Sequence, residues 1–296
     1  MTRKLALIPA LASLLFTTSV FAQALPKTDL WLAKVIDGIP VNPVKISPAG
    51  GYNNQPHFSG DGSLIFYTRE QAGKDGISQT DIAAFRPQTK STNMLNKSPE
   101  SEYSPTPIPG RQAVSVIRAD LDQKQLLWAI DVNNGNMDLL LPAVEPVGYH
   151  TWISATEVAM FILGESFTLQ IATLEQNGTR QVADNIGRSL RTHPQSNEVL
   201  FVDKNQEPWQ IAAYNPETED TRSVMPLFPG SEDFTIDKEG NYWTGNGSKL
   251  YRRSPGHQRW NLMVDFETHG ITQISRLAIH LDSGQIAFVN APSAAD

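Results

Sequence analysis

The 296-residue chain contains no cysteine. This absence excludes disulfide bonds, thiolate metal sites and attachment of a lipid through a cysteine. The chain also has no basic run: 24 lysines and arginines stand against 31 acidic residues, which gives a formal net charge of −7. Because contacts with phosphate groups need positive charge, nucleic acids and anionic membrane surfaces are poor partners for this sequence.

Motifs of common catalytic sites are missing as well. The sequence has no Gly-x-Ser-x-Gly nucleophile elbow, no His-Glu-x-x-His zinc motif and no phosphate-binding loop. The apolar stretch from Leu5 to Phe16 is too short to span a bilayer, and no later apolar stretch reaches the length of a membrane span. No motif therefore assigns the chain to a reaction, and a non-catalytic role is favoured over an enzymatic one.

The N-terminal segment has the pattern of an export signal. Two basic residues precede an apolar stretch, Leu5 to Phe16, and small residues at Ala22 and Ala24 suit a signal peptidase. The sequence therefore predicts a signal peptide over residues 1–24, cleaved after Ala22 or Ala24. The alternatives are an amphipathic first helix and a retained anchor. An exported chain without cysteine suits a bacterial periplasm, so we expect a periplasmic or secreted protein.

The most informative feature present is a phrase that recurs six times in degraded form. Its fullest copy is NNQPHFSGDGSLIFYT, residues 53–68, in which a short polar segment is followed by a strand, an Asp-Gly turn and a second apolar strand. The aligned copies share one column, formed by Phe58, Thr106, Trp152, Thr192, Thr235 and Ala278, with separations of 48, 46, 40, 43 and 43 residues. A period of about 40–45 residues with four strands per unit is typical of a β-propeller. The sequence thus predicts an all-β, six-bladed propeller with four antiparallel strands per blade.

The sixth copy ends after its second strand, whereas two unassigned strand-like segments lie at the start of the chain. Residues 29–35 resemble the third strands of other units, and residues 41–47 fit the fourth-strand position. Pairing these segments with the last copy would remove two open sheet edges at the seam of the ring. We therefore expect residues 25–296 to form a single domain whose last blade is closed by N-terminal strands.

The phrase QPHFSGDGSLIFYT resembles the repeat of the TolB-type and WD-like six-bladed propellers, which runs Pro-x-Phe/Trp-Ser-x-Asp-Gly before an apolar strand. Partial echoes occur at residues 152–154, 237–240 and 282–284. The resemblance covers nearly the whole chain after the export signal as a pattern. TolB itself has an additional N-terminal domain, for which this chain is expected to have no room. The resemblance implies an architecture, and it carries over neither chemistry nor partners residue by residue.

Binding surfaces of propellers gather where the inner strands begin, at the mouth of the central channel. In this chain the segments leading into the inner strands are mostly polar, aromatic or charged. The arginines among them have the fork geometry that suits carboxylate or phosphate oxygens, and the tyrosines can stack on a sugar or a peptide. The predicted ligand-binding residues are Asn54, His57, Glu102, Tyr103, Tyr149, His150, Arg188, Arg191, Glu232, Asp233 and Arg276.

The function predicted from these residues is non-catalytic binding of a protein, peptide or glycan partner at the channel mouth, by a monomer without a cofactor. Anionic or polar ligands are favoured over apolar ones. One alternative is that the polar side chains bond to one another and close the pore. A second is a metal-dependent hydrolase or lactonase, similar to gluconolactonase-type propellers, with a divalent ion such as Ca²⁺ held in the channel by Asn54, Glu102, Glu232 and Asp233. A third is a structural subunit that docks through its blade edges.

Overall fold

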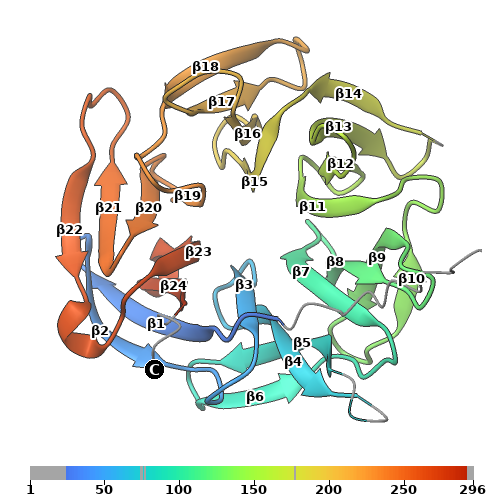
Figure 1. Cartoon of the computed structure of the whole chain (residues 1–296), viewed down its shortest axis with the longest axis horizontal. Helices are drawn as coiled ribbons and strands as arrows, with labels where there is room; N and C mark the ends of the chain where they lie inside the picture. Colours follow the sequence, from blue (N-terminus) through green and yellow to red (C-terminus); the bar gives the residue numbers. More distant parts are fainter. Residues whose placement is uncertain (1–24, 74–75, 77, 177, 292–296) are drawn as a thin grey trace, which may run out of the picture.

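The computed structural model describes residues 25–73, 76, 78–176 and 178–291. Across these residues, 24 strands form six four-stranded antiparallel sheets arranged in a ring (Figure 1). The predicted signal peptide, residues 1–24, lies outside the described residues. None of the helical segments in the described part is long and apolar enough to cross a bilayer. The prediction of a six-bladed propeller is confirmed.

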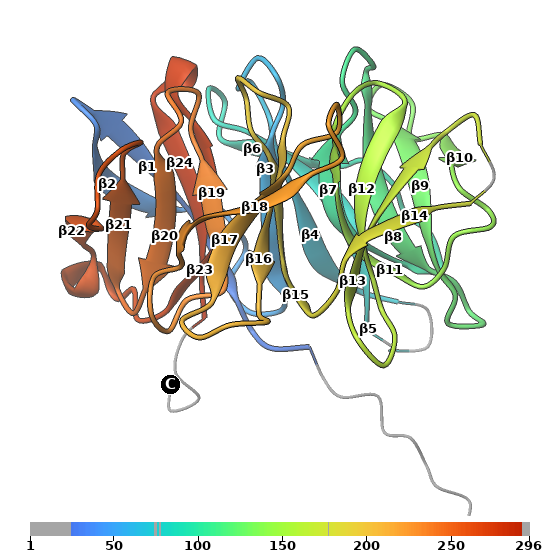
Figure 2. The same cartoon turned by 90° about the horizontal axis from the view of Figure 1, so that it is seen from above.

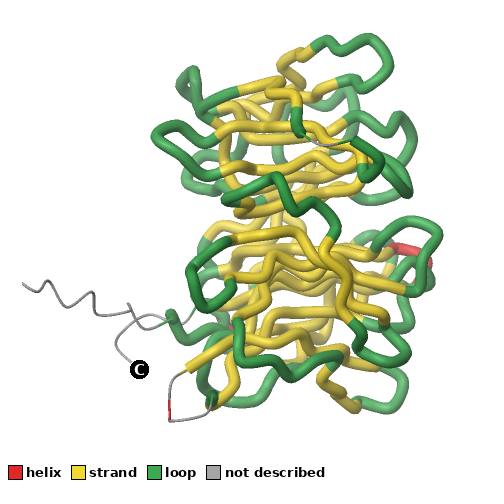
Figure 3. Tube along the Cα trace, turned by 90° about the vertical axis from the view of Figure 1, so that its right-hand side faces the viewer, coloured by secondary structure: helices red, strands yellow, loops and turns green. Residues whose placement is uncertain are grey.

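Blades 1 to 5 each consist of four consecutive strands, of which the first is innermost (Figure 1). Blade 1 contains β3 (Asn53–Phe58), β4 (Ile65–Ala72), β5 (Ser78–Arg86) and β6 (Ser91–Met94), and blade 2 contains β7 (Ser101–Pro107), β8 (Ala113–Ala119), β9 (Gln125–Asp131) and β10 (Met137–Leu139). Blade 3 contains β11 (Val147–Trp152), β12 (Glu157–Ile162), β13 (Thr168–Thr173) and β14 (Arg180–Ala183). Blade 4 contains β15 (Ile186–Thr192), β16 (Val199–Asp203), β17 (Gln210–Tyr214) and β18 (Thr221–Pro226), and blade 5 contains β19 (Phe234–Ile236), β20 (Tyr242–Asn246), β21 (Lys249–Arg253) and β22 (Asn261–Asp265). Seen edge-on, the strands cross the thickness of the ring and the loops gather on its two faces (Figures 2 and 3).

Blade 6 joins strands from both ends of the chain, as predicted. Its order is β2 (Ile39–Lys45), β1 (Asp29–Ile36), β24 (Gln285–Asn290) and β23 (Ile274–His280). The ladder between β1 and β24 is unbroken from the pair Asp29–Asn290 to the pair Lys34–Gln285. The N-terminal strands therefore cover the edge that β24 would otherwise leave open.

The hydrophobic core lies between neighbouring blades. Leu30 and Val289 of blade 6 pack in one buried cluster with Ile65 and Tyr67 of blade 1. Because each sheet is covered on both faces, its middle strands are apolar on both faces as well, as in the stretch EVAMFI of β12. Packing on both faces holds the six inner strands rigidly around the channel.

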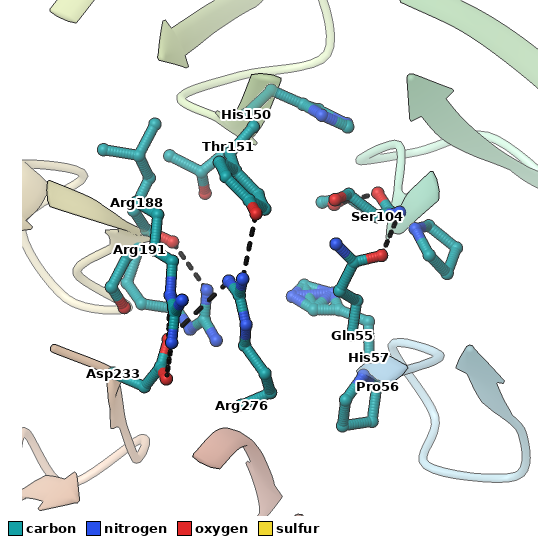
Figure 4. Close-up of a pocket in the computed structure, with 15 residues that line it drawn as sticks. Gln55, Pro56, His57, Ser104, His150, Thr151, Arg188, Arg191, Asp233 and Arg276 are labelled. Atoms are coloured by element: carbon teal, nitrogen blue, oxygen red, sulfur yellow. Dashed lines mark hydrogen bonds and ion pairs between the residues drawn. The ribbon is translucent and has the colours of Figure 1, made fainter. Parts of the chain in front are cut away.

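The inner strands depart from regular pairing where they approach the channel. Their register with the second strand shifts in blades 1, 2, 3, 4 and 6. At three of these shifts, Gln55, Ser104 and Arg276 adopt positive φ angles of 57°, 55° and 48°. A non-glycine residue in this conformation costs on the order of 1 kcal/mol, and such residues concentrate at ligand sites. The three residues all line the central cavity (Figure 4).

Candidate functional site

A cavity occupies the central channel and draws residues from every blade (Figure 4). Five inner strands contribute side chains from their own length, and blade 5 contributes Asp233 from the position just before β19. The cavity has a volume of about 50 Å³. Since a water molecule occupies about 30 Å³ in the liquid, this space admits one or two waters or one carboxylate-sized group, and it excludes a whole sugar ring.

Seven of the predicted ligand-binding residues line this cavity. They come from blades 1, 3, 4, 5 and 6 and are His57, Tyr149, His150, Arg188, Arg191, Asp233 and Arg276. Glu232, expected in the same polar cluster, lies directly behind the lining. Its Oε1 accepts hydrogen bonds from the backbone N–H of Arg188 at 3.0 Å and from Nζ of Lys204 at 2.8 Å.

Asp233 is the carboxylate at the centre of the cluster. Its side chain is 8% exposed and accepts a two-pronged contact from Arg188, with Nε at 3.2 Å and Nη2 at 2.7 Å. Nη1 of Arg276 lies 3.6 Å from Oδ1 of the same carboxylate. Burial alone would raise the pKa of Asp233, but the positive charges of Arg276 and Arg188 outweigh burial and lower it. Asp233 is therefore ionised at neutral pH.

Arg191 and Arg276 are held mainly by groups that carry no charge. Arg191 donates to the carbonyl oxygens of Leu190 at 2.7 Å and Leu277 at 2.9 Å. Burial lowers its pKa to about 10, so the guanidinium remains protonated at neutral pH. Arg276 lies over the ring of Tyr149, 4.9 Å from the centroid, and Nη2 donates to the Tyr149 hydroxyl at 2.9 Å.

Both histidines of the cavity are neutral. Burial lowers the pKa of His57 to about 3, with the nearby Arg191 adding to the effect, and burial lowers the pKa of His150 to about 3. Nε2 of His150 lies 2.6 Å from Oγ of Ser115, whereas Nδ1 of each histidine has no hydrogen-bond partner among the described residues. The lining thus carries three guanidinium groups, one carboxylate and two neutral imidazoles, which leaves an excess of positive charge.

The neutral state of these histidines predicts an acid-sensitive fold. A buried neutral histidine contributes stability that is complete above its unfolded pKa of about 6.5 and is lost as the pH falls from there towards the folded value of about 3. Each histidine should therefore lower the free energy of unfolding by about 2 kcal/mol between pH 7 and pH 5. Urea denaturation at both pH values should show a smaller loss in the double variant His57→Gln/His150→Gln than in wild type. The exposed His269→Gln serves as the control, and equal losses in wild type and the double variant would contradict the assignment.

Four predicted residues do not line the cavity. Asn54 Oδ1 accepts a hydrogen bond from the backbone of Gln55, and Tyr103 packs against the core between blades 2 and 3. Glu102 is fully buried between blades, where Asn96 and Ser98 donate to it, and burial raises its pKa to about 7. The inner strands begin earlier than expected: Asn54 and Glu102 are the second residues of β3 and β7. In blades 1 and 2 the residues that line the cavity begin with Gln55 and Ser104 at the register shifts, and Asn54, Glu102 and Tyr103 lie in the regular part of the strand before these shifts.

The residues present do not fit a divalent ion centred in the channel. Of the four proposed oxygen ligands, Asp233 alone lines the cavity, and Arg188 occupies both of its oxygens. In the part of the chain that the structure describes, no group of three or more histidine and acidic side chains is placed to hold a metal. The positive excess would also repel a cation.

Eight of the 15 residues that line the cavity were not predicted from the sequence, and Gln55 and Ser104 are the two of them that also have positive φ angles. Gln55 Oε1 accepts from Thr68 Oγ1 at 2.7 Å and from the backbone N–H of Ser104 at 2.9 Å, so it joins blade 1 to blade 2. Ser104 Oγ is buried and has no hydrogen-bond partner among the described residues. Both residues directly precede a proline, and this repeated polar-proline pair is the signal that marks them.

The sequence matches no protein-family model, and no curated protein matches it. Solved structures match the fold. A protein from Agrobacterium tumefaciens assigned as TolB superposes with a TM-score of 0.69 at 8% identity, over 90% of this chain and 98% of that one. TolB from Acinetobacter baumannii gives 0.60 at 10% identity, over 81% and 64%. An oligogalacturonate lyase in complex with manganese gives 0.54 at 12% identity, over 85% and 80%. The chain is thus similar in fold to TolB and to other propellers, and at these identities the likeness concerns the fold alone.

Proposed function

We propose that the protein is an exported, non-catalytic propeller that binds a protein, peptide or glycan partner by taking one acidic group of that partner into the channel mouth. The observation that carries this proposal is the charge of the cavity. Three guanidinium groups face one carboxylate across the described lining, and both histidines are neutral. If these side chains only bonded to one another and closed the pore, their charges would be expected to balance, because unpaired buried charge is costly.

The size of the cavity limits how a partner can bind. A volume of about 50 Å³ accommodates a carboxylate but no larger group. The body of the partner would therefore rest on the rim, with one acidic group inserted. Arg188, whose side chain is 36% exposed, is the guanidinium most accessible from the rim, and Arg276, at 15%, lies deeper. An incoming carboxylate would share these arginines with Asp233.

An enzymatic role has less support. The channel lacks a suitable set of metal ligands among the described residues, and the fold likeness to a lyase carries no chemistry at 12% identity. A structural subunit that docks through blade edges is the outcome if the cavity has no ligand.

Binding of defined acidic probes tests the proposal. Isothermal titration calorimetry at low ionic strength would compare a tetraglutamate peptide and trigalacturonate with a neutral tetraglutamine peptide. We expect the acidic probes to bind and Arg276→Gln to weaken them about tenfold or more, because one charge-assisted contact is lost. The exposed Arg111→Gln is the matched control and should bind like wild type. Equal binding by both variants, or no binding of either acidic probe, would overturn the proposal.

Export is tested on the mature protein. Mass spectrometry of material from the periplasm should show a chain that begins at Gln23 or Leu25, since small residues precede both positions. A soluble cytoplasmic protein that keeps Met1 would contradict both the location and the class of partner.

A further inference from the structure

A second cavity lies between blades 4 and 5, at the end of the ring where the inner strands finish. His193 follows β15 and Gly240 follows β19, and both line this cavity, whose volume is about 280 Å³. Apolar walls come from Val224 and Met225 of β18, and polar groups come from Tyr242 and Arg253. The residues of the channel mouth are not part of it.

Arg253 is the unusual group in this cavity. It is 8% exposed and makes a single hydrogen bond, from Nε to the carbonyl oxygen of His257 at 2.7 Å. Among the described residues, neither terminal nitrogen of Arg253 has a hydrogen bond or an acidic partner. Burial lowers its pKa, yet an arginine remains protonated at neutral pH. The terminal nitrogens of Arg253 are not among the described side-chain atoms that are closed off from solvent without a partner, so they face the open cavity, where an anion can bind them.

The nearby carboxylate does not supply that charge. Both oxygens of Glu198 are bound by Nη2 of Arg222 at 2.8 Å, and Ser196 Oγ donates to the same carboxylate at 2.9 Å. Arg253 and Tyr242 line the cavity, whereas Arg222 and Glu198 do not. Arg222 and Glu198 cancel one another, so the charge of Arg253 remains.

His193 adds a second donor. Its Nδ1 accepts hydrogen bonds from the backbone N–H groups of Gln195 at 3.3 Å and Ser196 at 3.4 Å. In the neutral ring the proton is therefore on Nε2. This nitrogen faces Gly240, where a Cβ atom would approach it to 3.7 Å and would approach Pro255 Cγ to 3.4 Å. Both distances are ordinary van der Waals contacts, so Gly240, which has a φ of 83°, lies directly beside Nε2 of His193 in the cavity wall.

We propose that this cavity binds a small organic carboxylate, whose oxygens lie on the terminal nitrogens of Arg253 and on Nε2–H of His193. The planar guanidinium matches a carboxylate in a two-pronged contact. The walls formed by Val224, Met225 and Pro255 take the apolar body of the ligand, and about 280 Å³ is enough for a single aromatic or short aliphatic acid. The site is independent of the channel mouth and of the function proposed for it.

Benzoate and its neutral counterpart benzamide test this site in the full-length protein. Titration of the wild-type protein with benzoate, followed by methyl NMR, should shift the Val224 and Met225 methyl signals, and benzamide should leave them unchanged. Arg253→Met should weaken benzoate binding at least tenfold, and Arg253→Lys, which keeps the charge but not the fork, should weaken it less. Arg252→Gln, one residue away in β21, is the matched control, and circular dichroism checks the fold of each variant.

Two further results separate this site from the channel. Arg276→Gln should bind benzoate like wild type, so failure of the channel proposal leaves this one standing. Absence of shifts at Val224 and Met225 up to millimolar benzoate would overturn the proposal even if Arg253→Met failed to fold. Equal binding of benzamide, or undiminished binding of benzoate by a folded Arg253→Met, would overturn it as well.

Discussion

Removal of residues 25–47 is expected to abolish cooperative unfolding. This deletion takes away β1 and β2, and with them the ladder from Asp29–Asn290 to Lys34–Gln285. It also removes Leu30 and Leu32 from the core between blades 6 and 1, where they are buried. Loss of each leucine alone would cost about 2–5 kcal/mol, against a total stability of about 5–15 kcal/mol for a typical domain. The exposed edge of β24 should in addition promote association.

Thermal unfolding and size-exclusion chromatography measure both effects. The matched control is deletion of residues 1–24, which should leave the melting temperature unchanged because this segment is the predicted signal peptide. A truncated protein lacking residues 25–47 that melts at the wild-type temperature and stays monomeric would contradict the closure of blade 6 by the N-terminal strands.

Replacement of Asp233 by alanine should give the second large loss. Removing one partner of a buried ion pair costs about 3–5 kcal/mol, and the loss here should lie at the lower end of this range, because Arg276 would keep a largely buried charge whereas the side chain of Arg188 is 36% exposed. Asp282→Ala is the matched control: Asp282 pairs with Lys238 at the surface, where solvent screens the pair, so this variant should lose far less stability than Asp233→Ala. Urea denaturation at pH 7 measures both variants.

Asp233 also makes the free energy of unfolding decrease at acidic pH. Because the folded pKa of Asp233 is lowered, its ionised form contributes stability above the unfolded value of 3.8, and that stability is lost as the pH falls through the folded pKa. Asp233→Ala should lack this loss. Sulfate should also stabilise Asp233→Ala more than wild type, since an anion can replace the missing carboxylate. A loss no larger than that of Asp282→Ala, with no response to sulfate, would show that Asp233 does not hold the arginines.

The architecture could be read from the sequence because its signals are local. Each Asp-Gly or similar turn marks a hairpin, and the column from Phe58 to Ala278 repeats at a propeller period. The missing strand pair of the last copy then requires residues 29–35 and 41–47 to close blade 6, which the ladder between β1 and β24 confirms. Counting strands was sufficient, and no side-chain geometry was needed.

The site could be predicted only in part, because register shifts decide which side chains reach the channel. Glu102 and Arg188 both seemed to lead into an inner strand, yet Glu102 is buried between blades and Arg188 lines the cavity. A one-residue shift exchanges the two faces of a strand, and the positive φ angles of Gln55 and Ser104 at such shifts have no reliable sequence signal. The charge excess was equally hidden, since it depends on Glu232 lying behind the lining, where Lys204 binds it at 2.8 Å and Nε of Arg188 is more distant at 3.9 Å.

The role of Arg253 in the second cavity could not be predicted from the sequence either. In the sequence it is one half of a basic pair with Arg252, and nothing distinguishes the two residues. In the structure, strand alternation places Arg252 over the ring of Trp243, 5.4 Å from the centroid, whereas Arg253 lines the cavity. The difference between a packed cation and an unpaired one comes from alternation in β21 and the arrangement of blades 4 and 5.

The central claim is that the channel mouth is a positively charged site that accepts an anion. Anomalous diffraction from crystals soaked in bromide tests this claim most directly. The account predicts a bromide peak in the central cavity, within contact of Arg276 and of Arg188 or Arg191, and loss of that peak in crystals of Arg276→Gln. A cavity that holds only water in bromide, with the arginines turned fully onto Asp233, would contradict it.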